Sequence, residues 1–156
     1  MSNEDFMREA IQLSEEGLRS GRGGPFGCVV VRNGTVVGRG SNQVTSSCDP
    51  TAHAEVVAIR NACRELKNFQ LNECTLYTSC EPCPMCLSAI YWARIPAVYY
   101  GNTRKDAAVV GFDDDFIYSE IPLPLERRMV AMKPLLREEA RSAFTEWSKK
   151  SDKVAY

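Results

Sequence analysis

The sequence contains a single histidine, His53, among its 156 residues. Any chemistry that needs an imidazole is therefore restricted to one place in the chain. A serine or cysteine nucleophile elsewhere has no histidine to act as its base. A zinc site made of three histidines is excluded for the same reason.

The sequence also lacks an apolar run of membrane-spanning length, and residues 1–8 are polar and acidic. We therefore expect a cytoplasmic protein that does not associate with a membrane. Neither sign of charge is in excess, because 19 Lys and Arg face 20 Asp and Glu, for a net charge of -1. This balance argues against a nucleic-acid partner, although a local basic patch is compatible with a neutral total.

There is no internal repeat, low-complexity segment or linker, so residues 1–156 are expected to form one domain. Hydrophobic periodicity and turn residues predict the elements of that domain. The expected helices cover residues 3–20, 83–94 and 135–150, and a further helix starts near His53 with Thr51 as its cap. The expected strands cover 26–32, 35–41, 74–79, 97–101 and 128–133, with a hairpin turn at Asn33-Gly34 and a loop over 45–52. This order predicts an α/β fold, a three-layer α-β-α sandwich with a mixed five-stranded sheet.

Seven cysteines are present, an odd number, and three of them cluster as Cys80, Cys83 and Cys86. Such spacing is more typical of metal binding than of a disulfide framework. Cys83 and Cys86 lie at the start of an expected helix, where the helix N-terminus favours thiolates. His53 opens another expected helix, so the three residues are candidate ligands of one zinc ion.

The carboxylate of Glu55, two residues after His53, favours a catalytic zinc site. Three protein ligands leave a fourth position for water, and a neighbouring carboxylate can move its protons. A closed structural site with Cys80 as fourth ligand is the alternative. An iron–sulfur run would need a cysteine at position 90, which is Ile90. Glu55 and Pro82 favour catalysis, with Cys80 lining the pocket without binding the metal.

The pattern His53-x-Glu55 followed by Pro82-Cys83-x-x-Cys86 is the signature of zinc nucleobase deaminases. With it, the sequence resembles the cytidine deaminase-like superfamily. The flanking stretches 24–27, 49–55, 77–86 and 111–114, together with a terminal tyrosine, more specifically resemble bacterial guanine deaminases. This similarity spans nearly the whole chain.

The resemblance implies a hydrolase of purine metabolism that converts guanine to xanthine and ammonia. One Zn²⁺ per subunit would be held by His53, Cys83 and Cys86, and Glu55 would transfer protons. The resemblance also assigns substrate contacts, with Asn42 hydrogen-bonding the purine, Phe26 stacking on it and Ala54 contacting it through the backbone. Asp114 would accept guanine N–H groups or act as a second proton-transfer group. The resemblance assigns the last substrate contact to the terminal residue, Tyr156.

In guanine deaminases the C-terminal segment crosses to the partner subunit. The resemblance therefore implies a domain-swapped homodimer in which residues 149–156 close the partner's site, with Tyr156 as a lid. Three alternatives remain open at this point. They are a tRNA adenosine deaminase, a deaminase of another small amine such as cytosine or an aminotriazine, and a module whose zinc serves only folding.

Overall fold

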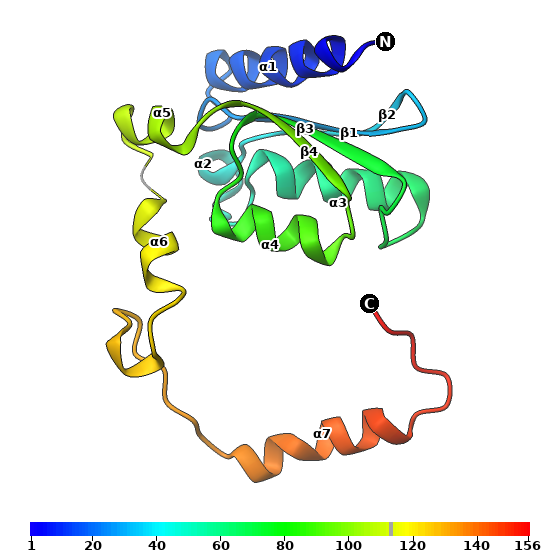
Figure 1. The fold of residues 1–156 in the computed structure, drawn as a ribbon, viewed down its shortest axis with the longest axis vertical. Helices are drawn as coiled ribbons and strands as arrows, with labels where there is room; N and C mark the ends of the chain where they lie inside the picture. Colours follow the sequence, from blue (N-terminus) through cyan, green and yellow to red (C-terminus); the bar gives the residue numbers. More distant parts are fainter. Residues whose placement is uncertain (113) are drawn as a thin grey trace. The chain divides into compact units, whose positions relative to one another are not determined.

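The computed structural model describes residues 1–112 and 114–156, and it divides the chain into two units, Met1–Asp115 and Phe116–Tyr156 (Figure 1). The first unit carries every strand that the described residues form. Its elements are α1 (Asn3–Arg19), β1 (Gly27–Arg32), β2 (Thr35–Ser41), α2 (Val44–Ser47), α3 (Ala54–Leu66), β3 (Cys74–Cys80), α4 (Pro84–Trp92), β4 (Ala97–Asn102) and α5 (Arg104–Val109).

The strands form a mixed sheet in the order β2-β1-β3-β4. β1 pairs antiparallel with both β2 and β3, and β4 pairs parallel with β3 after the crossover through α4. The predicted hairpin is confirmed, since Asn33 and Gly34 both have positive φ, 50° and 75°, as a tight two-residue turn requires. The expected α/β class with a mixed sheet is therefore confirmed.

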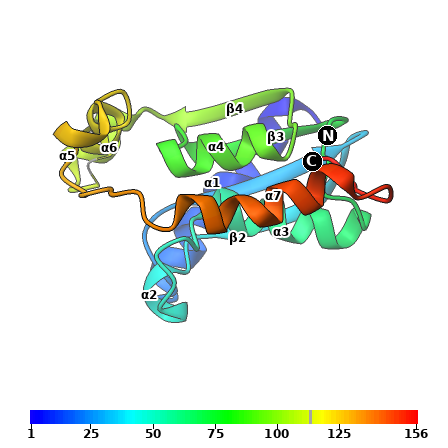
Figure 2. The ribbon, with the colours of Figure 1, turned by 90° about the horizontal axis from the view of Figure 1, so that it is seen from below.

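Helices cover both faces of this sheet. α1 lies on one face, and α3 and α4 lie on the other; Figure 2 looks from the side of α3 and α4, with α1 behind the sheet. Alternation along β1 divides the core accordingly. Val29 and Val31 pack with Phe6 and Ala10 of α1. The neighbours of Val29 and Val31 on β1 pack instead with α3 and α4, in a cluster that includes Cys28, Val30, Ala54, Ala58, Leu76 and Ile90.

The second unit contains most of α6 (Asp115–Glu120), a short 3-10 helix (Leu125–Arg127) and α7 (Arg137–Lys149). The expected helix over 135–150 is thus confirmed, but no residue of 116–156 is buried. The prediction of a fifth strand over 128–133 is wrong: among the described residues the sheet has four strands. A strand is defined by its pairing with a neighbour, and none of the described segments pairs with 128–133.

Two local expectations also need correction. Residues 45–52 were expected as a loop, yet Val44–Ser47 forms the short helix α2. His53, and not Thr51, is the N-cap of α3. The Thr51 hydroxyl donates to Asp49 Oδ1 at 2.7 Å instead, so its side chain closes the preceding turn. None of the helices in the described ranges is long and apolar enough to cross a membrane.

Candidate metal centre and active site

Two helix starts bring the candidate metal ligands together. His53 is the N-cap of α3 and Cys83 is the N-cap of α4, so both side chains project from the same kind of position. Cys86 lies in the first turn of α4, and its backbone N–H donates to Cys83 Sγ at 3.5 Å. The two helices begin at the same end of the sheet, the end at which β3 finishes (Figure 1).

The three ligand atoms have the spacing of a zinc site. Cys83 Sγ and Cys86 Sγ each lie 3.5 Å from His53 Nδ1, and all three atoms lie within 4.8 Å of one another. Tetrahedral zinc with bonds of about 2.0 Å to nitrogen and about 2.3 Å to sulfur separates these atoms by roughly 3.5 Å. One imidazole and two thiols in this arrangement therefore fit Zn²⁺.

The electrostatics prepare one thiolate before any metal binds. The hydrogen bond from the Cys86 thiol lowers the pKa of Cys83 to about 4, and the same bond raises the pKa of Cys86. The hydrogen bond with Cys83 raises the pKa of His53, against the effect of burial. Both sulfurs lie at a helix N-terminus, which favours thiolates, and a metal cation would displace the proton that remains on Cys86.

Glu55 lies beside this cluster with its carboxylate almost out of solvent, since the residue is 6% exposed. The Thr78 hydroxyl donates to Glu55 Oε1 at 3.1 Å, and the Cys86 thiol donates to Glu55 Oε2 at 3.4 Å. Burial is the main cause that raises the pKa of Glu55. A carboxyl with a raised pKa is suited to accepting a proton and giving it back near neutral pH.

Cys80 lies at the end of β3 and stands outside the group of three metal ligands. Its thiol donates to the backbone oxygen of Thr103 at 3.7 Å. Burial, followed by the charges of Glu55 and Asp114, raises the pKa of Cys80 to about 11. Cys80 is therefore a neutral thiol beside the site, which fits a lining residue better than a fourth ligand.

Asn42 follows β2 and is held in one orientation by backbone amides. Its Oδ1 accepts hydrogen bonds from the N–H of Gly24 and of Val44, both at 3.2 Å. A Cβ at Gly23 would lie 2.4 Å from this Oδ1, so the loop passes too close for a side chain there. With its oxygen engaged, the Asn42 side chain has its NH₂ group left for a ligand.

The other predicted substrate residues fall in different places. Phe26 packs edge-on against Phe112, with ring centroids 4.8 Å apart at 85°. Ala54 is the first residue of α3 and is fully buried. Asp114 interacts electrostatically with His53 and Cys83, and partial burial raises its pKa. Tyr156 belongs to the second unit, and Asp113, part of the predicted acidic run, lies outside the described residues.

Sequence reasoning missed two contributors to this site. Thr78 reads as an ordinary β-branched strand residue, and no local pattern links it to Glu55, 23 positions earlier. The hydrogen bonds from the backbone amides of Gly24 and Val44 to Asn42 likewise cannot be predicted from residue types alone. The Gly23-Gly24 pair was the only available signal, since a glycine pair permits close approach of the backbone.

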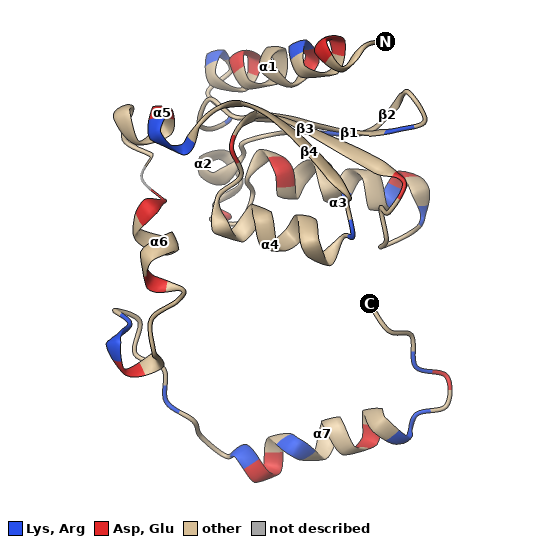
Figure 3. Cartoon of the chain, in the orientation of Figure 1, with Lys and Arg blue, Asp and Glu red and all other residues tan. Residues whose placement is uncertain are grey.

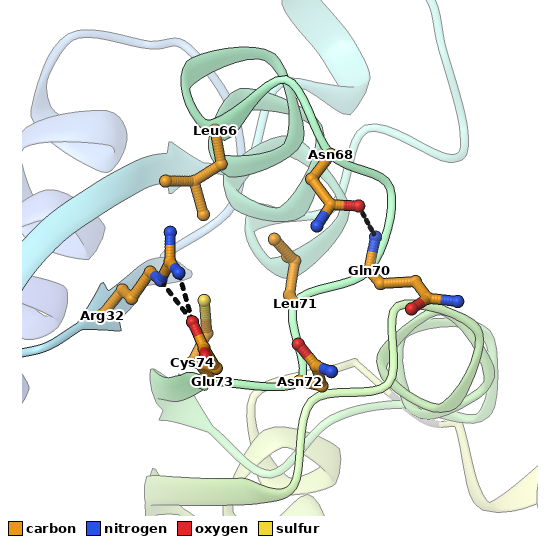
Figure 4. Close-up of a pocket in the computed structure, with 8 residues that line it drawn as sticks. All are labelled: Arg32, Leu66, Asn68, Gln70, Leu71, Asn72, Glu73 and Cys74. Atoms are coloured by element: carbon orange, nitrogen blue, oxygen red, sulfur yellow. Dashed lines mark hydrogen bonds and ion pairs between the residues drawn. The ribbon is translucent and has the colours of Figure 1, made fainter.

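A pocket elsewhere has no such chemistry. It lies at the opposite end of β3, around Cys74, and the Arg32–Glu73 ion pair closes one side of it (Figure 4). Its other lining residues are Leu66, Asn68, Gln70, Leu71 and Asn72. Its lining residues include no imidazole and none of the three candidate metal ligands.

Residues 1–102, which end with β4, match the family described as the cytidine and deoxycytidylate deaminase zinc-binding region. This range contains His53, Glu55, Cys83 and Cys86. The chain belongs to this family of zinc-binding deaminases.

Particular relatives narrow the comparison. The chain is 51% identical over 156 residues to guanine deaminase of Bacillus subtilis, covering 100% of both chains. A crystal structure of guanine deaminase from Bacillus subtilis superposes with a TM-score of 0.97, covering 100% of this chain and 99% of that one. A guanine deaminase structure from Nitrosomonas europaea has a TM-score of 0.70 at 25% identity, covering 96% and 86%. A tRNA-specific adenosine deaminase of Buchnera aphidicola is 42% identical over 105 residues, 67% of this chain and 64% of that protein.

Proposed function

We propose that the protein hydrolyses guanine to xanthine and ammonia. The observation that carries this proposal is the buried Glu55 carboxylate beside the His53, Cys83 and Cys86 cluster, in a chain similar over its whole length to guanine deaminase of Bacillus subtilis. The match to the tRNA-specific relative covers only 67% of the chain. A guanine deaminase function therefore accounts for the second unit, whereas a tRNA adenosine deaminase function leaves that unit unexplained.

His53, Cys83 and Cys86 would hold one Zn²⁺ per subunit. Zinc bound there would supply Lewis-acid activation of the attacking water. The two thiols and the imidazole lie at the distances that this role needs, and the lowered pKa of Cys83 favours its thiolate. Cysteine ligands must be reduced to bind, and all seven cysteines are free. This supports the expected cytoplasmic location.

Glu55 would move the protons of the reaction. Its Oε2 faces the cluster, while Oε1 is occupied by the Thr78 hydroxyl. Oε2 would take a proton from the attacking water as its oxygen bonds to C2 of guanine, and would pass it to a ring nitrogen. The carboxylate would then take the second proton from the new hydroxyl group on C2 and give it to the exocyclic amine, which leaves as ammonia while the C2 carbonyl forms. Each proton that Glu55 accepts is returned, so the residue ends in its starting state.

Asn42 would recognise an acceptor on the purine. Because two backbone amides occupy its Oδ1, its side chain can only donate, through the NH₂ group. Phe26 would stack on the ring, in an orientation braced by Phe112. The N–H of Ala54, in the first turn of α3, has no intrahelical acceptor and suits a ligand contact. Asp114 would accept guanine N–H groups or serve as a second proton carrier.

The second unit would complete the site of a partner copy. Its strongly exposed apolar side chains include Met129, Val130, Leu135, Phe144 and Trp147. Such an unpartnered surface on a segment of this size is typical of an exchanged element. A homodimer that swaps this unit, with residues 149–156 reaching the partner's site and Tyr156 as lid, would cover it. The two units would then act as one functional domain over residues 1–156.

The charge distribution favours a small substrate over RNA. α4 carries no charged residue, and α7 mixes Lys and Arg with Glu along its length (Figure 3). A protein that binds tRNA needs a positively charged surface, because contacts with the phosphates dominate the affinity. The resulting expectation is weak binding to tRNA.

The deciding experiment measures ammonia release from guanine by the zinc-loaded protein. Adenine, cytosine, guanosine and ammeline run in parallel, and tRNA is tested as substrate and by filter binding. Glu55→Gln is expected to lower the rate by roughly a hundredfold or more with zinc retained, and the exposed Glu65→Gln in the same helix serves as matched control. Activity on another amine, or on tRNA, with none on guanine would overturn the substrate assignment. Equal rates in Glu55→Gln and the wild type would overturn the mechanism.

A further inference from the structure

Thr78 and Glu55 are two polar side chains that meet inside an otherwise apolar layer. Thr78, in β3, is 1% exposed, and its hydroxyl donates to Glu55 Oε1 at 3.1 Å. Its antiparallel partner across the sheet is Cys28, which is fully buried in the cluster between the sheet and α3. Leu76, two positions before Thr78, belongs to the same cluster.

Burial of a hydroxyl and a carboxylate in such a layer is costly unless each finds a partner. Here they satisfy one another, and among the described residues no buried side-chain nitrogen or oxygen lacks a hydrogen-bond partner. A valine at position 78 would fill the same space on the strand without this requirement. The hydroxyl is therefore not explained by packing alone.

We infer that Thr78 is a positioning residue that fixes the plane of the Glu55 carboxylate, so that one oxygen is held by the strand and the other faces the His53, Cys83 and Cys86 cluster. Rotation about the last side-chain bond of Glu55 is otherwise soft, because that torsion joins an sp³ and an sp² carbon. The hydroxyl of Thr78 removes this freedom by engaging one oxygen from the strand side. The other oxygen is then held toward the reacting atoms before a substrate arrives.

The position of Thr78 suits this task because it is set by the sheet. The residue lies within the paired part of β3, with β1 on one side and β4 on the other. Glu55 lies in the first turn of α3, which packs on the same face of the sheet. The hydrogen bond therefore ties the proton-transferring group of a helix end to a strand that is paired on both sides.

Two substitutions of Thr78 separate positioning from packing. Thr78→Val keeps the volume and removes the donor, whereas Thr78→Ser keeps the donor and removes a methyl group. With guanine as substrate, we expect Thr78→Val to lower kcat by roughly tenfold to a hundredfold, the effect of losing a hydrogen bond to a charged group. KM and zinc content should stay within about twofold of the wild type, since Thr78 is proposed to contact neither the purine nor the zinc ion.

Thr78→Ser should restore kcat to within about threefold of the wild type, because it keeps the hydroxyl that donates to Glu55. Both variants should lose thermal stability, Thr78→Ser through a small cavity and Thr78→Val through the carboxylate oxygen left without a donor. A packing role predicts the reverse order of activities. Equal kcat in Thr78→Val and the wild type, or a fall in Thr78→Ser as large as in Thr78→Val, would overturn the inference.

The kcat measurements rest on the proposed guanine deaminase activity. A second measurement, by infrared spectroscopy, does not depend on that activity. The infrared carboxyl band of Glu55 in the metal-free protein is the band that disappears in Glu55→Gln. We expect this band to shift in Thr78→Val and to stay in place in Thr78→Ser. A shift without activity on guanine would contradict only the proposed function, and an unshifted band in Thr78→Val would contradict the positioning role.

Discussion

Gly40 in β2 and Ala54 at the start of α3 lie so close that a Cβ on Gly40 would be 2.1 Å from the backbone oxygen of Ala54. Gly38 has the same relationship to Ala58, at 2.4 Å. The helix that carries His53 and Glu55 therefore rests directly on the backbone of the strand. The place of the proposed metal and proton-transfer groups is set by the absence of side chains in β2.

Gly40→Ala should lower both stability and zinc affinity. The added methyl group would push the first turn of α3 away from the sheet, and overpacking of this kind costs about 1–3 kcal/mol of unfolding free energy. Because Ala54 lies between His53 and Glu55, the same movement would displace a ligand. Denaturant unfolding and zinc titration measure the two effects.

Arg39→Ala is the matched control, because Arg39 is the neighbouring residue and its exposed side chain pairs with Glu9 on the other face. Loss of such a pair costs at most about 1 kcal/mol. Equal stability and equal zinc affinity in the two variants would contradict the close contact between Gly40 and Ala54.

Removal of the metal should lower the melting temperature and abolish deamination. Cys83→Ser and Cys86→Ser should each reduce bound zinc to near zero and lower the melting temperature, since binding to the folded state alone stabilises it. Cys48→Ser, at an exposed cysteine, should change neither quantity. Zinc analysis and thermal melts of the three variants check this, and full zinc occupancy in Cys86→Ser would refute the ligand assignment.

Asn42 offers a substitution that separates its two sets of hydrogen bonds. Asn42→Asp keeps an oxygen for the amides of Gly24 and Val44 but loses the NH₂ group. We expect KM for guanine to rise by roughly tenfold to a hundredfold, because the variant loses the NH₂ group that would donate to the purine. The melting temperature should stay unchanged, because the hydrogen bonds within the protein are kept. Asn42→Ala should raise KM and lower the melting temperature. If Asn42→Asp binds guanine as tightly as the wild type, Asn42 does not contact the substrate.

The proposed swap predicts recovery of activity in a mixed dimer. Glu55→Gln destroys one subunit's site but leaves its terminal segment intact, and Tyr156→Ala does the opposite. In a swapped heterodimer one site would combine intact Glu55 with the intact Tyr156 of the partner. Refolding an equal mixture should recover about a quarter of wild-type activity, since half the dimers are mixed and half of their sites are complete. No recovery above the separate variants would argue that each subunit closes its own site.

The sequence patterns predicted those parts of the fold that depend on neighbouring residues. Asn33-Gly34 specified a hairpin through backbone geometry, and the apolar stripe of Ala54, Val57, Ala58 and Ala62 specified a helix. The proximity of His53, Cys83 and Cys86 was also predictable, because two short patterns each place their side chains at a helix start. Their role as zinc ligands stays a prediction. Long-range pairing decided the rest. Residues 128–133 have an apolar stretch suited to a strand, but a strand also needs a neighbour to pair with, and no described segment pairs with these residues.

Local competition and register explain the remaining misses. Thr51 has the side chain of a helix cap, but Asp49 engages its hydroxyl and leaves the cap position to His53. Thr78 and Glu55 meet only after β3 has found its register against β1. The roles of Phe26, Asn42, Ala54, Asp114 and Tyr156 with a purine stay predictions. Sequence spacing alone cannot place a ligand against side chains from separate elements.

Because His53 is the only histidine in the sequence, its imidazole ring can serve as a spectroscopic probe of the proposed metal centre. His53 Nδ1 faces both sulfurs, so Nε2 is the nitrogen that keeps the ring proton when a cation binds. Every histidine signal in a nuclear magnetic resonance spectrum of the chain therefore comes from the centre itself. Metal loading, exchange for cadmium or cobalt and ligand arrival would each be read from one ring without isotope editing or assignment.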